Sequence, residues 1–179
     1  VGSGGVLSHA PRREQACKIM IDSFLPEGVT QIAVDSIFMM PQLGVLASVH
    51  EKAAIQVFNK DCLIRLGTCI APIGSGEHGE DMMEYSIEVK DERISGILKY
   101  GELKLIKASY MPCKVEFNTK GKYKINAETL YSDEVYGGEV GIILDGRGRP
   151  FNLEYSSKNR LELIKKWRNA LNEYPTLEI

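Results

Sequence analysis

The chain has 179 residues, enough for one ordinary domain or for the end of one domain followed by a small second one. Hydrophobic residues make up 44% and charged residues 26%, which is normal for a globular protein, and the formal net charge of -2 gives no electrostatic case for nucleic acid or an anionic membrane. No apolar run approaches the ~20 residues that a membrane helix requires, and no secretory signal is visible. We therefore expect a cytoplasmic protein.

The first eleven residues, VGSGGVLSHAP, combine a glycine turn with a proline that can open a helix. A glycine turn followed by a helix is a recurrent way to seat a nucleotide. A simple strand-to-helix turn explains the same spacing. The spacing alone therefore does not distinguish such a turn from a nucleotide-binding loop. Only Val1 remains of any strand before this loop, and this suggests a fragment of a longer protein.

The next segments alternate between helix and strand. Apolar residues at three- and four-residue intervals (Ala16, Ile19, Met20, Phe24) predict a helix over 12–25 that Pro26 and Gly28 stop. A short, buried strand is expected over 30–35, and we expect it to be parallel because a helix precedes it. Helices are expected over 43–47 and 51–59, the second with Ala54, Ile55 and Phe58 inward.

From about Asp61 the pattern changes to short apolar or alternating runs with turn signals between them. Strands are expected within 63–73, 83–90, 93–108, 113–118, 123–127 and 139–145. A helix over 157–174 closes the chain, with Pro175 past its end and a core stripe of Leu161, Ile164, Trp167 and Leu171. The fold class is thus α+β. A short α/β segment (1–60) precedes a β-rich, barrel- or sandwich-like domain (61–179) with a C-terminal helix.

Cysteine and histidine spacing gives no metal site. The cysteines are Cys17, Cys62, Cys69 and Cys113, and the histidines are His9, His50 and His78. No C-x-x-C pair occurs, three cysteines have apolar neighbours, and no histidine has a second ligand at metal-binding spacing. Buried, reduced thiols are the expectation.

Two glycine-rich loops could mimic ligand sites. Residues 74–79 read G-x-G-x-x-G, but the dinucleotide fingerprint needs a helix at that loop, and here a strand follows. We interpret this loop as an exposed turn. Residues 145–150 (DGRGRP) could form an anion nest, but a hairpin turn with solvated arginines is the commoner reason for such a run. A third interpretation of these residues, a surface patch that binds a partner subunit, also remains open.

Other chemistry is not indicated. The terminal helix is basic (Lys158, Arg160, Lys165, Lys166, Arg168), which in a nearly neutral chain is usually a solvated face. No P-loop occurs, and no catalytic triad can be assembled from local spacing. No catalytic residue is assigned.

Several motifs together resemble one known family. They are GSGGVLSHAP, VDSIFMMPQLGVLASVHEKAA, LGTCIAP with YGELKLI, and GGEVGIILDGRGRP, which span residues 1–150. They look like the C-terminal portion of the accessory or reactivating ATPases of adenosylcobalamin-dependent glutamate (methylaspartate) mutase and related aminomutases. These ATPases belong to the actin-like and sugar-kinase-like superfamily.

The resemblance implies a site that is only half present. Gly2, Ser3, Gly4 and Gly5 would line the adenosine of ATP, while the Mg²⁺-holding and catalytic groups would lie upstream, so the fragment alone would be inactive. Asp35, at a strand end, is interpreted as a cap for the next segment. The longer protein would drive the exchange of damaged cobalamin in a mutase subunit, its partner.

Two other functional classes remain open at this stage. One is a non-enzymatic β-module that binds a mutase subunit or self-associates as a homodimer. The other, an independent NAD-dependent enzyme, rests on the weak loop at 74–79 alone.

Overall fold

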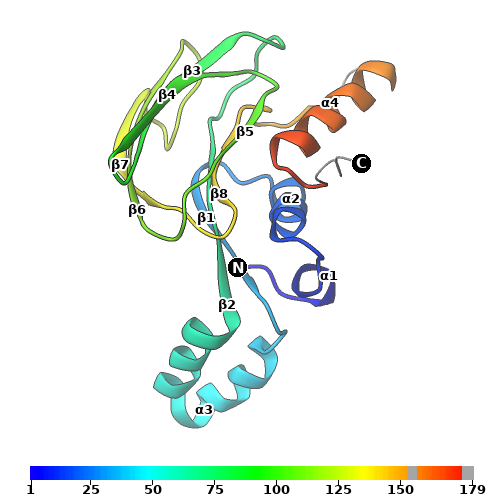
Figure 1. Ribbon diagram of the computed structural model, residues 1–179, viewed down its shortest axis with the longest axis vertical. Helices are drawn as coiled ribbons and strands as arrows, with labels where there is room; N and C mark the ends of the chain where they lie inside the picture. Colours follow the sequence, from blue (N-terminus) through cyan, green and yellow to red (C-terminus); the bar gives the residue numbers. More distant parts are fainter. Residues whose placement is uncertain (153–156, 175–179) are drawn as a thin grey trace.

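The computed structural model describes residues 1–152 and 157–174, which form three layers (Figure 1). One four-stranded sheet has the order β1-β2-β8-β5, and its strands are β1 (Gly28–Asp35), β2 (Leu63–Ala71), β5 (Leu103–Ile106) and β8 (Gly141–Asp145). The other has the order β4-β3-β6-β7, with β3 (Asp81–Val89), β4 (Glu92–Lys99), β6 (Pro112–Thr119) and β7 (Leu130–Tyr136). The helices are α1 (Gly5–Ser8), α2 (Arg13–Phe24), α3 (Met40–Val57), the π-helix η1 (Phe58–Cys62) and α4 (Ser157–Ala170).

The two sheets pack face to face as a sandwich, so the alternative of a closed barrel is wrong. Strand β6 buries every second residue, and Val115 and Phe117 on its inner face share one apolar cluster with Ile142 and Leu144 of β8. The expected mixed α+β class and the C-terminal helix are confirmed.

Helices α2 and α4 cover the other face of the first sheet. Ala16, Cys17, Met20 and Ile21 of α2 share a cluster with Leu163 and Trp167 of α4 and with Leu171 just after it. The stripe expected for α2 was half wrong, because Ile19 and Phe24 are exposed and Cys17 and Ile21 lie inward in their place. In α4, Leu161 is exposed and Leu163 is buried instead. Pro175 lies outside the described residues.

The parallel arrangement expected for β1 holds only at one edge, where Gly2, ahead of α2, forms a single parallel bridge to Val34. At its other edge β1 has an antiparallel partner. It pairs with β2 in the antiparallel sense, and the parallel pair of this sheet is β2 with β8. The expected boundary near residue 60 thus falls between two strands of one sheet. A helical hairpin, rather than a crossover, joins them.

Strand β7 was missed, and the strand expected over 123–127 is reduced to isolated bridges at Lys124 and Ile125. Four of the seven residues of β7, Leu130 and 132–134, are exposed, so its alternation is weak. All four cysteines are buried and free, as expected. Among the described helices, none is long and apolar enough to cross a membrane.

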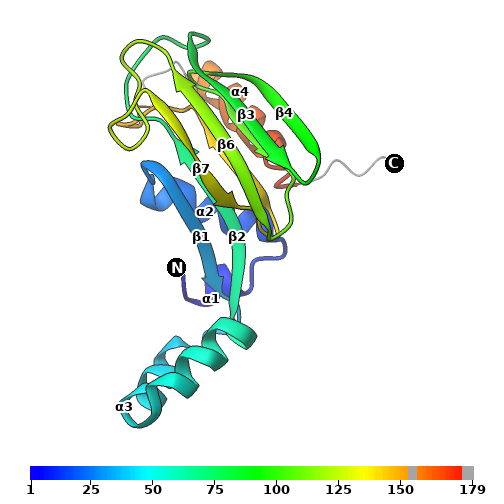
Figure 2. The same cartoon turned by 90° about the vertical axis from the view of Figure 1, so that its left-hand side faces the viewer.

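The α3 hairpin projects from this layered body (Figures 1 and 2). The two helices expected at 43–47 and 51–59 form one assigned helix with a non-helical residue, His50, at φ -151° and ψ 77°. A small seam of Leu43, Ala54 and Cys62 holds the two arms together.

Candidate functional site

The opening loop is anchored to the edge of β1. The Gly2 N–H donates to the carbonyl of Ala33 (2.8 Å), and the N–H of Asp35 donates to the carbonyl of Gly2 (2.8 Å). Gly2 is buried, and a Cβ there would lie 2.6 Å from Leu7 Cδ1 and 2.9 Å from the sulfur of Met20. Gly2 is therefore required for packing between the loop and α2.

Ser3 and Asp35 meet where this loop reaches the base of α3. Ser3 Oγ donates to Asp35 Oδ2 (3.0 Å), and the same carboxylate accepts the N–H groups of Met39 (3.1 Å) and Met40 (2.9 Å). Burial would raise the pKa of Asp35, but these hydrogen bonds hold it below its usual range. The interpretation of Asp35 as a cap for the next segment is confirmed.

Gly4 and Gly5 are the members of the loop that leave open space. A Cβ built at either position meets no heavy atom within 4 Å. Gly4 has φ +120°, so only glycine suits its backbone, whereas Gly5 carries no such constraint. This surface leaves room for a flat ligand, although the Ser3 hydroxyl already donates its hydrogen bond to Asp35.

The described residues offer no group of three or more His, Cys, Asp or Glu that could hold a metal ion. Binding of Mg²⁺ beside this loop stays a prediction. The role of Gly2, Ser3, Gly4 and Gly5 against adenosine stays a prediction.

The loop at 74–79 is a turn. Gly74 pairs with Arg149 through its N–H (2.9 Å), and strand β3 follows the loop where a dinucleotide site would need a helix. A Cβ at Gly74 would lie 2.7 Å from the ring of Tyr123, so its glycine serves close packing. The motif gives no support for NAD.

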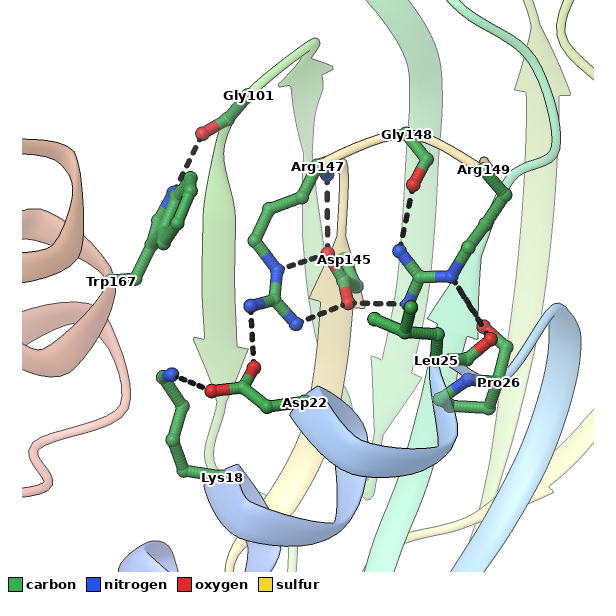
Figure 3. A network of polar contacts seen from close by, with 10 residues as sticks. All are labelled: Lys18, Asp22, Leu25, Pro26, Gly101, Asp145, Arg147, Gly148, Arg149 and Trp167. Carbon is green, nitrogen blue, oxygen red and sulfur yellow. Dashed lines mark hydrogen bonds and ion pairs between the residues drawn. The ribbon is translucent and has the colours of Figure 1, made fainter. Parts of the chain in front are cut away.

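The DGRGRP segment forms a buried ionic network, shown in Figure 3. Asp145, Arg147 and Arg149 expose 0%, 3% and 2% of their surface, so the expectation of solvated arginines was wrong. Asp145 accepts Arg147 Nε and Nη2 (2.8 Å each) on its two oxygens, and Arg149 Nη2 also donates to Oδ2 (2.8 Å). An internal carboxylate occupies the position that an external anion would take in a nest.

The same network ties β8 to α2 (Figure 3). Arg147 Nη1 donates to Asp22 Oδ1 (2.6 Å), Lys18 pairs with the other oxygen of Asp22, and Arg149 Nε donates to the carbonyl of Pro26 (2.9 Å). Burial would raise the pKa of Asp145, but the two arginines hold it below its usual range. The network is internally satisfied, and we assign it a structural role.

A surface that motif analysis overlooked lies on the α3 hairpin. We define the hairpin surface as the large apolar side chains that α3 and its entry leave exposed: Ile37, Phe38, Met40, Val45, Leu46, Val49, Ile55 and Val57. Val45 and Val49 expose 73% and 81% of their surface. The signal in the sequence is the run Met40–Val49, ten residues without a charge.

Comparison with known proteins gives one match. A family model described as MutL protein matches residues 1–62, which is 62 of the 179 residues. No curated protein and no solved structure shows a significant match. The match covers the opening loop, α2, β1 and the α3 hairpin with η1, and it ends where β2 begins.

This finding corrects the family resemblance drawn from the sequence. The matching model is that of MutL protein, and not that of an actin-like ATPase or of a reactivating ATPase of glutamate mutase. The assignment to that ATPase family, the glutamate mutase accessory role and the link to cobalamin are withdrawn with it. What stands is a similarity to MutL protein over residues 1–62.

Proposed function

We propose that this chain is a non-enzymatic assembly module that self-associates through the hairpin surface. One observation carries the proposal: the helical hairpin projects from the body (Figure 2), and it leaves eight large apolar side chains exposed. Contiguous apolar patches of more than a few hundred Å² are rare on soluble monomers and mark interaction sites.

The size of the surface supports a second copy of the chain as its partner. Side chains of this kind expose on the order of 50–120 Å² each, so eight of them approach the ~800 Å² per partner of a standard interface. Two helical hairpins that bury such faces against each other would form a four-helix bundle.

Its charge supports the same partner. A two-fold interface brings the same patch of both copies together, so like charges would face one another. The arm Met40–Val49 has no charged residue and thus no such repulsion. At the seam inside each hairpin, Leu43 and Ala54 are already buried and would keep their places.

Sedimentation of the full chain at micromolar concentration tests the proposal. The parent chain should sediment as a dimer, and Val49→Glu should convert it to a monomer with an unchanged far-UV circular dichroism spectrum, because the side chain is 81% exposed. Val6→Glu is the matched control, since Val6 is 74% exposed and belongs to α1 rather than to the hairpin surface. A monomeric parent chain, or a dimer that survives Val49→Glu, contradicts the proposal.

A further inference from the structure

A notch of about 260 Å³ opens beside β1 and β2, next to the end of β7. Its lining includes Gln31 and Ala33 of β1, Arg65 and Gly67 of β2, Tyr110 from the β5–β6 connection, and Tyr136 at the end of β7. The space corresponds to the volume of roughly eight or nine water molecules, since each takes up about 30 Å³ in the liquid. It can hold a small organic molecule.

Arg65 is held in a fixed orientation at this notch. Its guanidinium carbon lies 4.9 Å from the centroid of the Tyr110 ring, and Tyr110 stacks on Tyr136 with centroids 5.4 Å apart and planes 30° apart. Tyr136 is held in turn, because Thr68 Oγ1 donates to its carbonyl (2.7 Å). A cation–π contact of this kind fixes the guanidinium and leaves its in-plane N–H groups available.

The charge of the notch is one-sided. Of the described residues that line it, Arg65 alone carries a charged side chain, and none is an aspartate or glutamate. Within residues 1–152, all arginines but Arg65 have a carboxylate partner within 4.0 Å. They are Arg12, Arg13, Arg93, Arg147 and Arg149. In that part of the chain the guanidinium of Arg65 is paired only with an aromatic ring.

We propose that this notch binds a small monocarboxylate with an apolar body. A planar guanidinium fork matches a carboxylate through two parallel N–H···O bonds, and one arginine balances one negative charge. Inorganic phosphate, which carries more charge at neutral pH, is matched less well. Tyr110, Ala33 and the aliphatic part of the lining, which includes Leu63, would contact the body of the ligand.

Chemical-shift titration of the ¹⁵N-labelled full chain tests the assignment. Isovalerate should shift the amide resonances of Arg65, Gly67 and Gly137, which line the notch, whereas its neutral isostere isovaleramide should bind at least tenfold more weakly. Arg65→Gln should abolish the isovalerate shifts, and Arg65→Lys should retain part of the affinity. Arg93→Gln is the control, because Arg93 lies on the second sheet paired with Glu116 (2.7 Å).

Several results with isovalerate, its amide or Arg65→Gln would overturn the assignment. They are the absence of isovalerate shifts, equal affinity for isovaleramide, and shifts that persist in Arg65→Gln. Phosphate that binds as tightly as isovalerate and depends on Arg65 would show a general anion site and would also contradict the carboxylate assignment. If Arg65→Gln unfolds, Arg65→Lys decides, since a site built on the guanidinium fork must lose affinity there. None of these readouts depends on the hairpin surface.

Discussion

The three glycines of the opening loop differ in whether their position requires a glycine. Gly2 is excluded from carrying a side chain by Leu7 and Met20, and Gly4 by its positive φ. Gly5 has neither constraint, although the sequence presents all three as one motif. Sequence spacing cannot separate these cases, because it contains no information on what a missing Cβ would touch.

Gly2→Ala and Gly5→Ala separate packing from ligand binding. Gly2→Ala should destabilise the chain by about 1–3 kcal/mol through overpacking, and Gly5→Ala by less than ~0.5 kcal/mol because its space is open. Thermal unfolding measures both. If the loop binds adenine nucleotide, Gly5→Ala should weaken ATP binding at least fivefold in calorimetry while leaving the unfolding temperature unchanged. An unchanged affinity would remove the adenosine prediction for this loop.

At the scale of elements, the sequence predicted those whose cause is local. Helix α2 ends at Phe24, and the next residue, Leu25, is left-handed with φ 45° immediately before Pro26, as turn chemistry predicts. Strands β2, β3, β6 and β8 were expected from apolar or alternating runs. Features that depend on contacts distant in sequence were not predicted. Strand β7 is an edge strand with weak alternation. The direction of β1 is set by its pairing with β2, which begins 28 residues after β1 ends.

The same limit applied to the sites. The arginines of DGRGRP look like surface residues because what buries them is distant in sequence: Asp22 of α2, which pairs with Arg147, lies more than 120 residues away. Arg65, Tyr110 and Tyr136 come from three separate segments, so their meeting leaves no local motif. The hairpin surface, in contrast, could have been found from the uncharged run Met40–Val49.

The N-terminal end of α3 depends on Asp35. Asp35→Ala removes the acceptor for the N–H groups of Met39 and Met40 and should cost about 1–2 kcal/mol. For a chain of this size that is an unfolding temperature lower by roughly 2–8 °C. Hydrogen exchange should show faster exchange at Met39 and Met40, with less change in β3. Asp35→Asn, which keeps an acceptor oxygen, should recover part of the loss; equal exchange in both variants would contradict this role.

At the scale of the whole molecule, the parts of the chain before and after residue 60 share one apolar cluster and one ionic network. Asp145 lies at the centre of that network, between β8 and α2. Its folded pKa is depressed, so its contribution to stability is present above the unfolded pKa of about 3.9 and is lost as pH falls through the lower folded value.

Urea unfolding between pH 7 and pH 3 measures this dependence. Asp145 should contribute a constant stability between pH 7 and about pH 5 and a falling one below about pH 4. Asp145→Asn leaves Arg147 and Arg149 without a buried counter-charge and should cost about 3–5 kcal/mol while removing that part of the acid dependence. Where that variant does not fold, Asp22→Asn, at the partly exposed end of the network, should cost less. A stability that is equal at pH 7 in the parent chain and in Asp22→Asn would contradict the coupling of α2 to β8.

The strand order of the first sheet has a consequence for biosynthesis. Strand β8 lies between β2 and β5, yet among the strands of the described residues it is the last to leave the ribosome. Until residue 145 has emerged, β2 and β5 each lack a neighbour and present unpaired backbone edges. A nascent chain with these unpaired edges can associate with other chains. We therefore expect chaperones at the ribosome to bind mainly within residues 63–145.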